Sequence, residues 1–294
     1  MSIIWNNSTL SGLGDRLNDI LILSSFAKIK NKKLKLIWRT QDFNPNCEFA
    51  IKRPSFRRKD YLLENLNKYI SLPENIIIYK EGTNIEYNNN EDELYTSYIG
   101  GVCSPITFYH ANIDNLKYNI KDFLDIYYSQ AKNIKFNFDI NFDKYNKIIS
   151  VHLRRTDKLH VKEKETHGVS IDKIDMLDNL TFDLIEKFIN DGYKNFYFAG
   201  DDIYYINQYI NKYNNRINIL NSKLRDDSDD IKNTYLDLYI MANSEFIILS
   251  QRHSSFSLLA SMINKAKLIY LFNDDIIERT NYKSLPNIIY YKNL

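Results

Sequence analysis

The sequence predicts an α/β protein whose second half is a parallel, doubly wound sheet with helices on its faces. From residue 148 onward, short apolar runs rich in Ile, Leu and Phe alternate with longer stretches in which apolar residues recur at helical spacing. Strands that alternate with helices pair in parallel, so we expect a Rossmann-like domain here. The five candidate strands are 148–153, 195–199, 217–220, 246–249 and 268–272.

The candidate helices of the second half lie between these strands. A polar loop is expected at 156–179, followed by a helix that Thr181 would begin as its N-cap. An acidic loop is expected at 225–230. The four predicted helices are 181–190, 203–213, 233–243 and 255–263.

The N-terminal half begins with an apolar run, Ser2 to Trp5, and a glycine loop, Gly12-Leu13-Gly14-Asp15-Arg16. Apolar residues then recur at helical spacing to Ala27, and Lys33 to Trp38 is a second candidate strand. Glycines before a helix N-terminus suit a bound anion. Leu17 stands where a dinucleotide fingerprint has its third glycine, so the loop alone predicts only a tight turn.

Residues 40–145 carry weaker signals, and we assign them to the same N-terminal α/β domain. A helix is expected near 60–70, a strand at Ile76 to Tyr79, and a helix near 120–133, with an acidic, Asn-rich stretch at 84–93. The predicted domains are 1–145 and 146–294, with the boundary in the polar stretch 139–147.

Composition excludes several classes of function. A net charge of +2 over 294 residues gives no global field for a nucleic-acid partner. Cys47 and Cys103 lack metal-ligand spacing, which argues against a zinc site and fits a reducing compartment. The N-terminus lacks the pattern of a secretion signal and no run is long enough to span a membrane, so we expect a cytoplasmic protein.

A cluster of lysines has two interpretations that the sequence leaves open. It is either a solvated helix end, where cations complement the macrodipole, or a weak attachment to the inner, anionic face of a membrane. The cluster consists of Lys28, Lys30, Lys32, Lys33 and Lys35.

The segment Ile148–Asp157, IISVHLRRTD, is the strongest candidate for a binding site. A buried strand would deliver Arg154, Arg155 and Asp157 to the loop beyond its carboxyl end, where open α/β sheets bind ligands. Arginine suits phosphate because its planar donors match the oxygen geometry and keep their charge. The alternative is a surface ion pair between Arg155 and Asp157.

Three polar segments follow predicted strands and are expected to converge, because the strands are parallel. They are His152 to Asp157, Gly200-Asp201-Asp202, and Ser250 through Ser257. Together they offer cations for a diphosphate, carboxylates for a ribose or a base, and hydroxyls at a helix N-terminus. This set fits a nucleoside diphosphate better than a nicotinamide.

Four motifs in order resemble the fucosyltransferase superfamily of α1,6-, α1,2- and protein O-fucosyltransferases. VHLRRTDK resembles its HxRRxD motif and is most similar to the α1,6 branch, while GLGD resembles the glycine loop of chitin-oligosaccharide α1,6-fucosyltransferases. AGDD and LDLYIMANSEFIILSQRHSSFSLLA resemble the later motifs. The resemblance covers about residues 2–24 and 148–272.

The resemblance implies a GT-B fold, with two Rossmann-like domains facing a cleft, the acceptor against 1–145 and GDP-fucose in 146–294. By resemblance, Arg154 holds the β-phosphate within a cradle of glycine and serine residues, and His152 and Asp237 contact the guanine. The other residues expected to bind nucleotide are Gly12, Gly14, Arg155, Asp201, Asp202, Ser254 and Ser255. Neither metal nor cofactor is expected, because arginine and loop amides would neutralise the leaving diphosphate.

Two departures from the α1,6 and α1,2 patterns leave the sugar and linkage open. In the α1,6 enzymes a glutamate downstream of the arginine motif is the proposed catalytic base; the matching position here is Lys162, with Glu163 and Glu165 nearby. The segment SFSWW of the α1,2 enzymes is replaced here by Ser255 to Leu259. Glu163 is the first candidate base, although KEKE also fits a solvated charge run.

We therefore expect an inverting, metal-independent glycosyltransferase that transfers fucose from GDP-fucose to a glycan or oligosaccharide, as in polysaccharide biosynthesis. The alternatives are another GDP-hexose or GDP-heptose donor, or a non-catalytic relative that binds nucleotide or glycan. The oligomeric state stays open.

Overall fold

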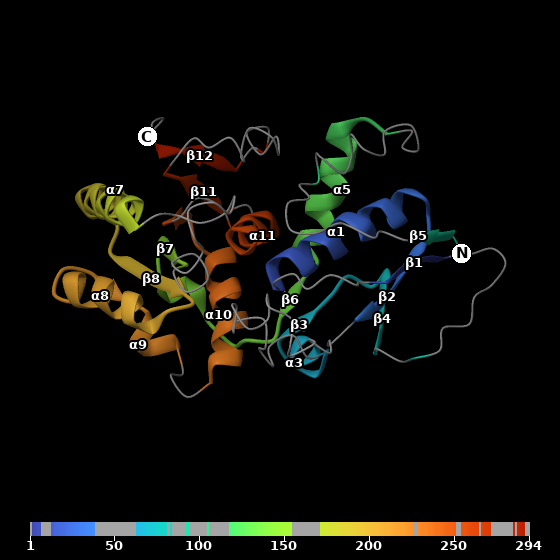
Figure 1. Ribbon diagram of the computed structural model, residues 1–294, viewed down its shortest axis with the longest axis horizontal. Helices are drawn as coiled ribbons and strands as arrows, with labels where there is room; N and C mark the ends of the chain where they lie inside the picture. Colours follow the sequence, from blue (N-terminus) through green and yellow to red (C-terminus); the bar gives the residue numbers. More distant parts are fainter. Residues whose placement is uncertain are drawn as a thin grey trace. The chain divides into compact units, whose positions relative to one another are not determined.

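In the computed structural model, the chain forms two compact units, Met1–Asn137 and Phe138–Leu294 (Figure 1). The division falls just before the stretch 139–147 in which the sequence analysis put the boundary. The structure describes residues 2–6, 13–38, 63–80, 83, 92–94, 105, 118–154, 171–225, 229–250, 254–264, 266–271, 285 and 287–291.

The first unit contains a parallel sheet with the strand order β4-β2-β1-β5. The strands are β1 (Ser2–Asn6), β2 (Lys33–Trp38), β4 (Ile76–Lys80) and β5 (Asp92–Leu94). Strand β5 was not predicted, because its sequence, DEL, has no apolar run. A strand at the edge of a sheet pairs through its backbone, so polar side chains do not exclude it.

Three helices and a short antiparallel pair complete the described part of the first unit. The helices are α1 (Leu13–Ile29), α3 (Leu63–Tyr69) and α5 (Ile120–Lys132), and the pair is β3 (Ile70–Ser71) with β6 (Lys135–Phe136). Helix α1 is buried on nearly all sides. Two of its buried polar residues are paired with α5: Tyr127 donates to Asn18 at 2.5 Å, and Ser24 donates to Gln130 at 3.0 Å.

The second unit contains a parallel sheet with the order β12-β11-β10-β7-β8-β9. The α/β class and the parallel pairing are therefore confirmed. The strands are β7 (Ile148–Leu153), β8 (Asn195–Gly200), β9 (Asn218–Ile219), β10 (Phe246–Leu249), β11 (Lys267–Tyr270) and β12 (Ile288–Tyr290). The sixth strand, β12, was not predicted.

The chain order explains where this sheet can hold a ligand. From β7 the chain builds outward through β8 and β9, then returns to the other side of β7 and builds outward through β10, β11 and β12. The order therefore reverses between β7 and β10. In open α/β sheets, ligands bind beyond the carboxyl ends of strands at such a reversal.

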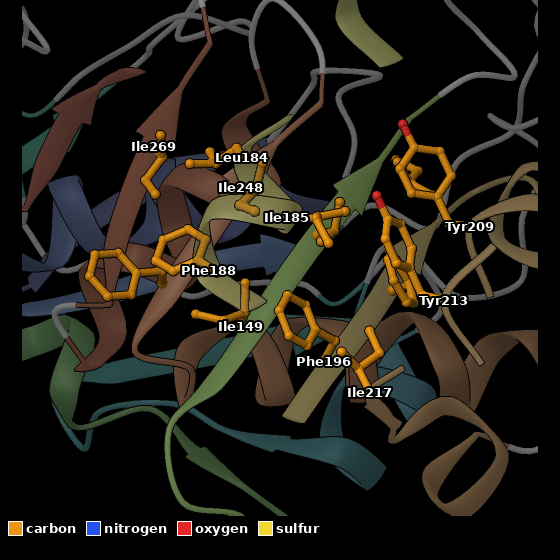
Figure 2. Packing of buried hydrophobic residues seen from close by; sticks show 14 of the residues in the cluster. Ile149, Leu184, Ile185, Phe188, Phe196, Tyr209, Tyr213, Ile217, Ile248 and Ile269 are labelled. Atoms are coloured by element: carbon orange, nitrogen blue, oxygen red, sulfur yellow. The ribbon is translucent and has the colours of Figure 1, made fainter. Parts of the chain in front are cut away.

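Helices cover both faces of this sheet. Ile149, Val151 and Leu153 of β7 belong to a core that includes side chains from α7 (Ile171–Asn190) and α8 (Ile203–Tyr213), part of which Figure 2 shows. Because side chains alternate along a strand, Ser150 and His152 point to the opposite face. There they bond to Ser244 at 2.6 Å and to Ser257 at 2.5 Å.

Two further helices of the second unit lie against this second face. Helices α10 (Asp230–Ala242) and α11 (Ser255–Asn264) pack against each other, and each also contacts strands of the sheet. The described residues also include a short helix, α9 (Asn221–Leu224), and a 3₁₀ turn, η4 (Phe142–Lys144).

The prediction that Thr181 begins a helix was wrong. Helix α7 begins at Ile171, and Thr181 lies in its interior, fully buried. The Thr181 hydroxyl donates to the carbonyl oxygen of Leu177 at 2.7 Å, and its oxygen lies 2.8 Å from the Ser250 hydroxyl, which can donate to it. A threonine can lie in the interior of a helix when its hydroxyl bonds to a carbonyl oxygen of the preceding turn. The apolar residues Leu177, Leu180 and Leu184 recur at helical spacing on both sides of Thr181.

None of the helices within the described ranges has the length and apolar character that crossing a bilayer needs.

Candidate functional site

The candidate site lies at the carboxyl ends of β7 and β10, where the strand order reverses. Leu249 pairs with His152, and the backbone N–H of Ser250 donates to the carbonyl oxygen of His152 at 3.1 Å. Arg154 and Ser250, the first residues beyond β7 and β10, therefore come from neighbouring strands. This is the edge at which the sequence predicted an anion site.

His152 is held in place by helix α11. Its side chain is buried, and Nδ1 lies 2.5 Å from the Ser257 hydroxyl oxygen. The imidazole also packs at a tilt against Phe256, with ring centroids 5.8 Å apart. The bond at Nδ1 fixes the orientation of the ring, and because a serine hydroxyl can both donate and accept, it is compatible with either tautomer. Residues far apart in the sequence thus set the direction in which His152 can donate or accept.

The start of helix α11 carries the two predicted serines. Ser254 is buried, and its hydroxyl accepts a long bond, 3.4 Å, from the N–H of Ser257. Ser255 is the first helical residue and is partly exposed. The first N–H groups of a helix lack partners within it and carry a partial positive charge, so this end suits a phosphate. The structure therefore brings His152, Ser254 and Ser255 to one end of α11.

Arg154 follows β7 directly and is partly buried, with protein contacts of its own. Along β7, the side chain of Leu153 faces the core of α7 and α8, whereas His152 faces α11. If this alternation continues by one residue, Arg154 turns to the side of His152. Arg155, Asp157, Glu163, Glu165 and Gly12 lie outside the described residues.

Gly14 is described, and it lies buried in the first turn of α1. It belongs to the first unit, whereas the other described site residues belong to the second.

At the carboxyl end of β8, Gly200 makes a close backbone contact. A Cβ added there would lie 2.3 Å from the carbonyl oxygen of Leu153, so only glycine fits without a backbone shift. The next two residues are partly exposed. Asp202 is the N-cap of α8, where its carboxylate accepts from the N–H of Tyr204 at 2.9 Å. Asp201 stands beside it, at the same end of β8.

Asp237, predicted to contact a guanine, is buried on α10 and engaged by three protein donors. Oδ1 accepts from the Tyr197 hydroxyl at 2.5 Å and from Nη1 of Arg225 at 2.6 Å. Oδ2 accepts from the N–H of Gly200 at 3.3 Å. The carboxylate therefore lies beneath the end of β8, bonded to the protein.

The sequence analysis assigned no site role to Tyr197 of this cluster, and it also missed Arg225. Its only sequence signal is that it precedes the acidic run Asp226-Asp227-Ser228-Asp229-Asp230, so it was grouped with the acidic loop. Burial acts to lower the pKa of the Arg225 guanidinium, but the attraction of Asp237 and Tyr197 raises it above its ordinary value. Burial raises the pKa of the Asp237 carboxyl, and Arg225, Tyr197 and the Gly200 N–H oppose that rise.

Within the described ranges, no three His, Cys, Asp or Glu side chains are grouped so that they could hold a metal ion.

No protein-family model and no curated protein matches this chain. Among solved structures, it is similar to the α1,6-fucosyltransferase NodZ soaked with GDP-fucose, at 12% identity and a TM-score of 0.47, over 90% of this chain and 93% of that one. It is also similar to fucosyltransferase NodZ from Bradyrhizobium, at 11% identity and a TM-score of 0.42, over 88% and 93%. POFUT1 in complex with GDP-fucose matches at 16% identity and a TM-score of 0.44, over 89% and 93%.

Proposed function

We propose that the protein is a GDP-sugar-dependent glycosyltransferase, with GDP-fucose as the first candidate donor. The observation that carries the proposal is the pairing of β7 with β10, which places the strand end bearing Arg154 beside the strand that leads into α11. An arginine and a helix N-terminus at the reversal of a parallel sheet form a natural diphosphate site.

The chemistry follows from that diphosphate site. An acceptor hydroxyl of a glycan or oligosaccharide attacks the anomeric carbon of the donor and inverts it, and GDP leaves. The transition state resembles an oxocarbenium ion, and negative charge develops on the β-phosphate. Arg154, the Ser254 and Ser255 hydroxyls and the N-terminus of α11 would meet that charge without a metal ion. Fixed donors of this kind typically contribute about 3–4 kcal/mol each to the lowering of a barrier.

The remaining expected residues take supporting roles in this proposal. His152 would contact the guanine, and Asp201 and Asp202 would line the nucleotide pocket or position its neighbours. Arg155 would shape the loop after β7, and Gly12 and Gly14 would offer backbone donors from the first unit. We further propose a GT-B fold, in which the first unit receives the acceptor.

The first experiment measures release of GDP from GDP-fucose by the purified protein, with and without EDTA, and compares GDP-mannose as a donor. We expect turnover of GDP-fucose that EDTA leaves intact. Strict dependence on Mg²⁺ or Mn²⁺ would contradict the metal-independent mechanism. Faster turnover of GDP-mannose would keep the enzyme class and change the donor. Binding of GDP without any turnover would favour the non-catalytic alternative.

The second experiment addresses the catalytic base. A base must reach the acceptor hydroxyl and be ionised, and Glu163 is closest in register to the glutamate of the resembling enzymes. Glu163→Gln should lower turnover about 100-fold while GDP affinity stays unchanged. Glu165→Gln, in the same charged run, is the matched comparison. Normal transfer by both variants would place the base elsewhere.

A further inference from the structure

We propose that Arg225 selects the guanine base of the nucleotide, through its Nε–H and the acceptor edge formed by guanine N7 and O6, and that Asp237 positions the guanidinium. This inference rests on the proposed function, because it assumes a GDP-sugar donor. It assigns Asp237 a different task from the one that the resemblance implies, since the carboxylate would act through Arg225.

The first support is the state of the Arg225 side chain. Only 10% of it is exposed, and the Asp237 side chain that it bonds is 7% exposed. Arg225 uses Nη1 for Asp237, whereas its Nε is buried and has no hydrogen-bond partner among the residues that the structure describes. Nine in ten buried polar groups have a partner, and an unmade bond costs stability, so such a donor calls for an explanation.

The second support is the way in which Asp237 is engaged. Its two oxygens accept from Tyr197, Arg225 and the Gly200 backbone, three donors that come from β8 and from the end of α9. A carboxylate bonded in this way fixes a neighbouring guanidinium well. To read guanine N1–H and the 2-amino group directly, it would have to share or exchange these partners.

The third support is position. Gly200 pairs with Leu153, the residue before Arg154, so the Asp237 and Arg225 pair lies under the strand adjacent to the diphosphate site. Neighbouring strands are about 4.8 Å apart. A nucleotide whose diphosphate meets Arg154 can extend its ribose and base across β8 toward Arg225.

The chemistry of the bases then gives selectivity. Guanine presents two acceptors, N7 and O6, to an arginine fork, whereas adenine presents an amino group in place of O6. A base without a matching acceptor leaves the buried donor unpaired, and sites of this kind reject such ligands strongly.

Nucleotide analogues test the assignment on the unaltered protein. IDP lacks the 2-amino group and keeps N7 and O6, whereas 7-deaza-GDP lacks only N7. By calorimetry, we expect IDP to bind within about threefold of GDP and 7-deaza-GDP about tenfold more weakly. Equal affinity for GDP and 7-deaza-GDP would overturn the proposal. No binding of any of the three would instead refute the proposed function.

A variant then ties the preference to the residue. Arg225→Gln should weaken GDP binding about 10- to 100-fold and bring GDP and 7-deaza-GDP to equal affinity, because the group that reads N7 is gone. Arg216→Gln is the matched control, since Arg216 is an arginine of the same unit that pairs with Glu186 at the surface. A preference for N7 that persists in Arg225→Gln would overturn the assignment. The analogue panel decides the question even if this variant fails to fold.

Discussion

At the scale of single residues, Arg154 is the side chain on which the proposed chemistry depends most. It is partly buried at the end of a fully buried strand, so its guanidinium is directed by the fold more than an exposed arginine would be. Lysine keeps the charge but presents a point donor in place of a planar fork. Replacing Arg154 by lysine therefore separates the effect of the positive charge from that of the planar donor geometry.

We predict that Arg154→Lys lowers the release of GDP from GDP-fucose at least 100-fold, which is the loss typical of one fixed donor to a developing anion. The melting temperature should stay close to that of the wild type. Arg216→Lys, at the surface ion pair with Glu186, should behave as the wild type in both assays. Retention of most of the turnover by Arg154→Lys would show that the diphosphate is held elsewhere.

A second residue, Asp19, is buried in α1 outside the proposed chemistry. It is 1% exposed, and its Oδ2 has no hydrogen-bond partner within the described part of the chain. Burial, and then the charge of Asp15, raise the pKa of the Asp19 carboxyl well above its ordinary value of 3.8. The folded protein therefore retains this proton to a higher pH than the unfolded chain does.

The sign of the pH effect follows from that raised pKa. The raised pKa contributes fully to the free energy of unfolding at pH values below the pKa that Asp19 has in the unfolded chain. This contribution falls by about 1.4 kcal/mol for each pH unit between the unfolded-state and the folded-state pKa, and it is lost once the pH exceeds the folded-state pKa. We predict that Asp19→Asn gains in melting temperature over the wild type as the pH rises from 4 to 8. Parallel melting curves across this range would contradict the raised pKa.

At the scale of elements, the close approach of β7 and β8 at Gly200 positions both the Arg154 end and the Asp237 cluster. We predict that Gly200→Ala lowers the free energy of unfolding by more than about 2 kcal/mol and weakens GDP binding, because the added Cβ meets backbone rather than a movable side chain. Denaturant melts and calorimetry give the two values.

Gly192 provides the matched control for Gly200→Ala. It has φ +90° but open space around its Cβ position, and it lies at the opposite, amino end of β8. Gly192→Ala should cost about 1 kcal/mol through backbone strain and leave GDP affinity unchanged. If Gly200→Ala and Gly192→Ala weaken GDP binding equally, the contact between β7 and β8 has no specific role in that binding.

At the scale of the whole molecule, a ligand that binds only the folded state must raise its stability. We predict that GDP at about 100 times its dissociation constant adds roughly 2.7 kcal/mol, whereas UDP and CDP at the same concentration add little. A thermal-shift series with GDP, UDP, CDP and ADP measures this. Equal shifts from UDP and GDP would contradict the selection of guanine.

The sequence by itself determined the elements whose apolar pattern is continuous. The strands 148–153 and 246–249 and the helix 203–213 were predicted with the bounds that the structure shows, because buried parallel strands are apolar throughout and α8 has a strong helical period. The placement of Arg154 at a strand end follows from that pattern as well.

Only the tertiary structure decided which polar groups meet. Thr181 bonds to Ser250, and Asp237 bonds to Arg225 and Tyr197, although these partners lie on different helices and strands. Hydrophobic periodicity shows that a residue faces inward, but not which polar group it finds there. Burial makes an unpaired polar group costly, so strand order and helix packing select the partner. For this reason the resemblance to known motifs implied Asp237 as a site residue, whereas the sequence did not reveal the arginine that it holds.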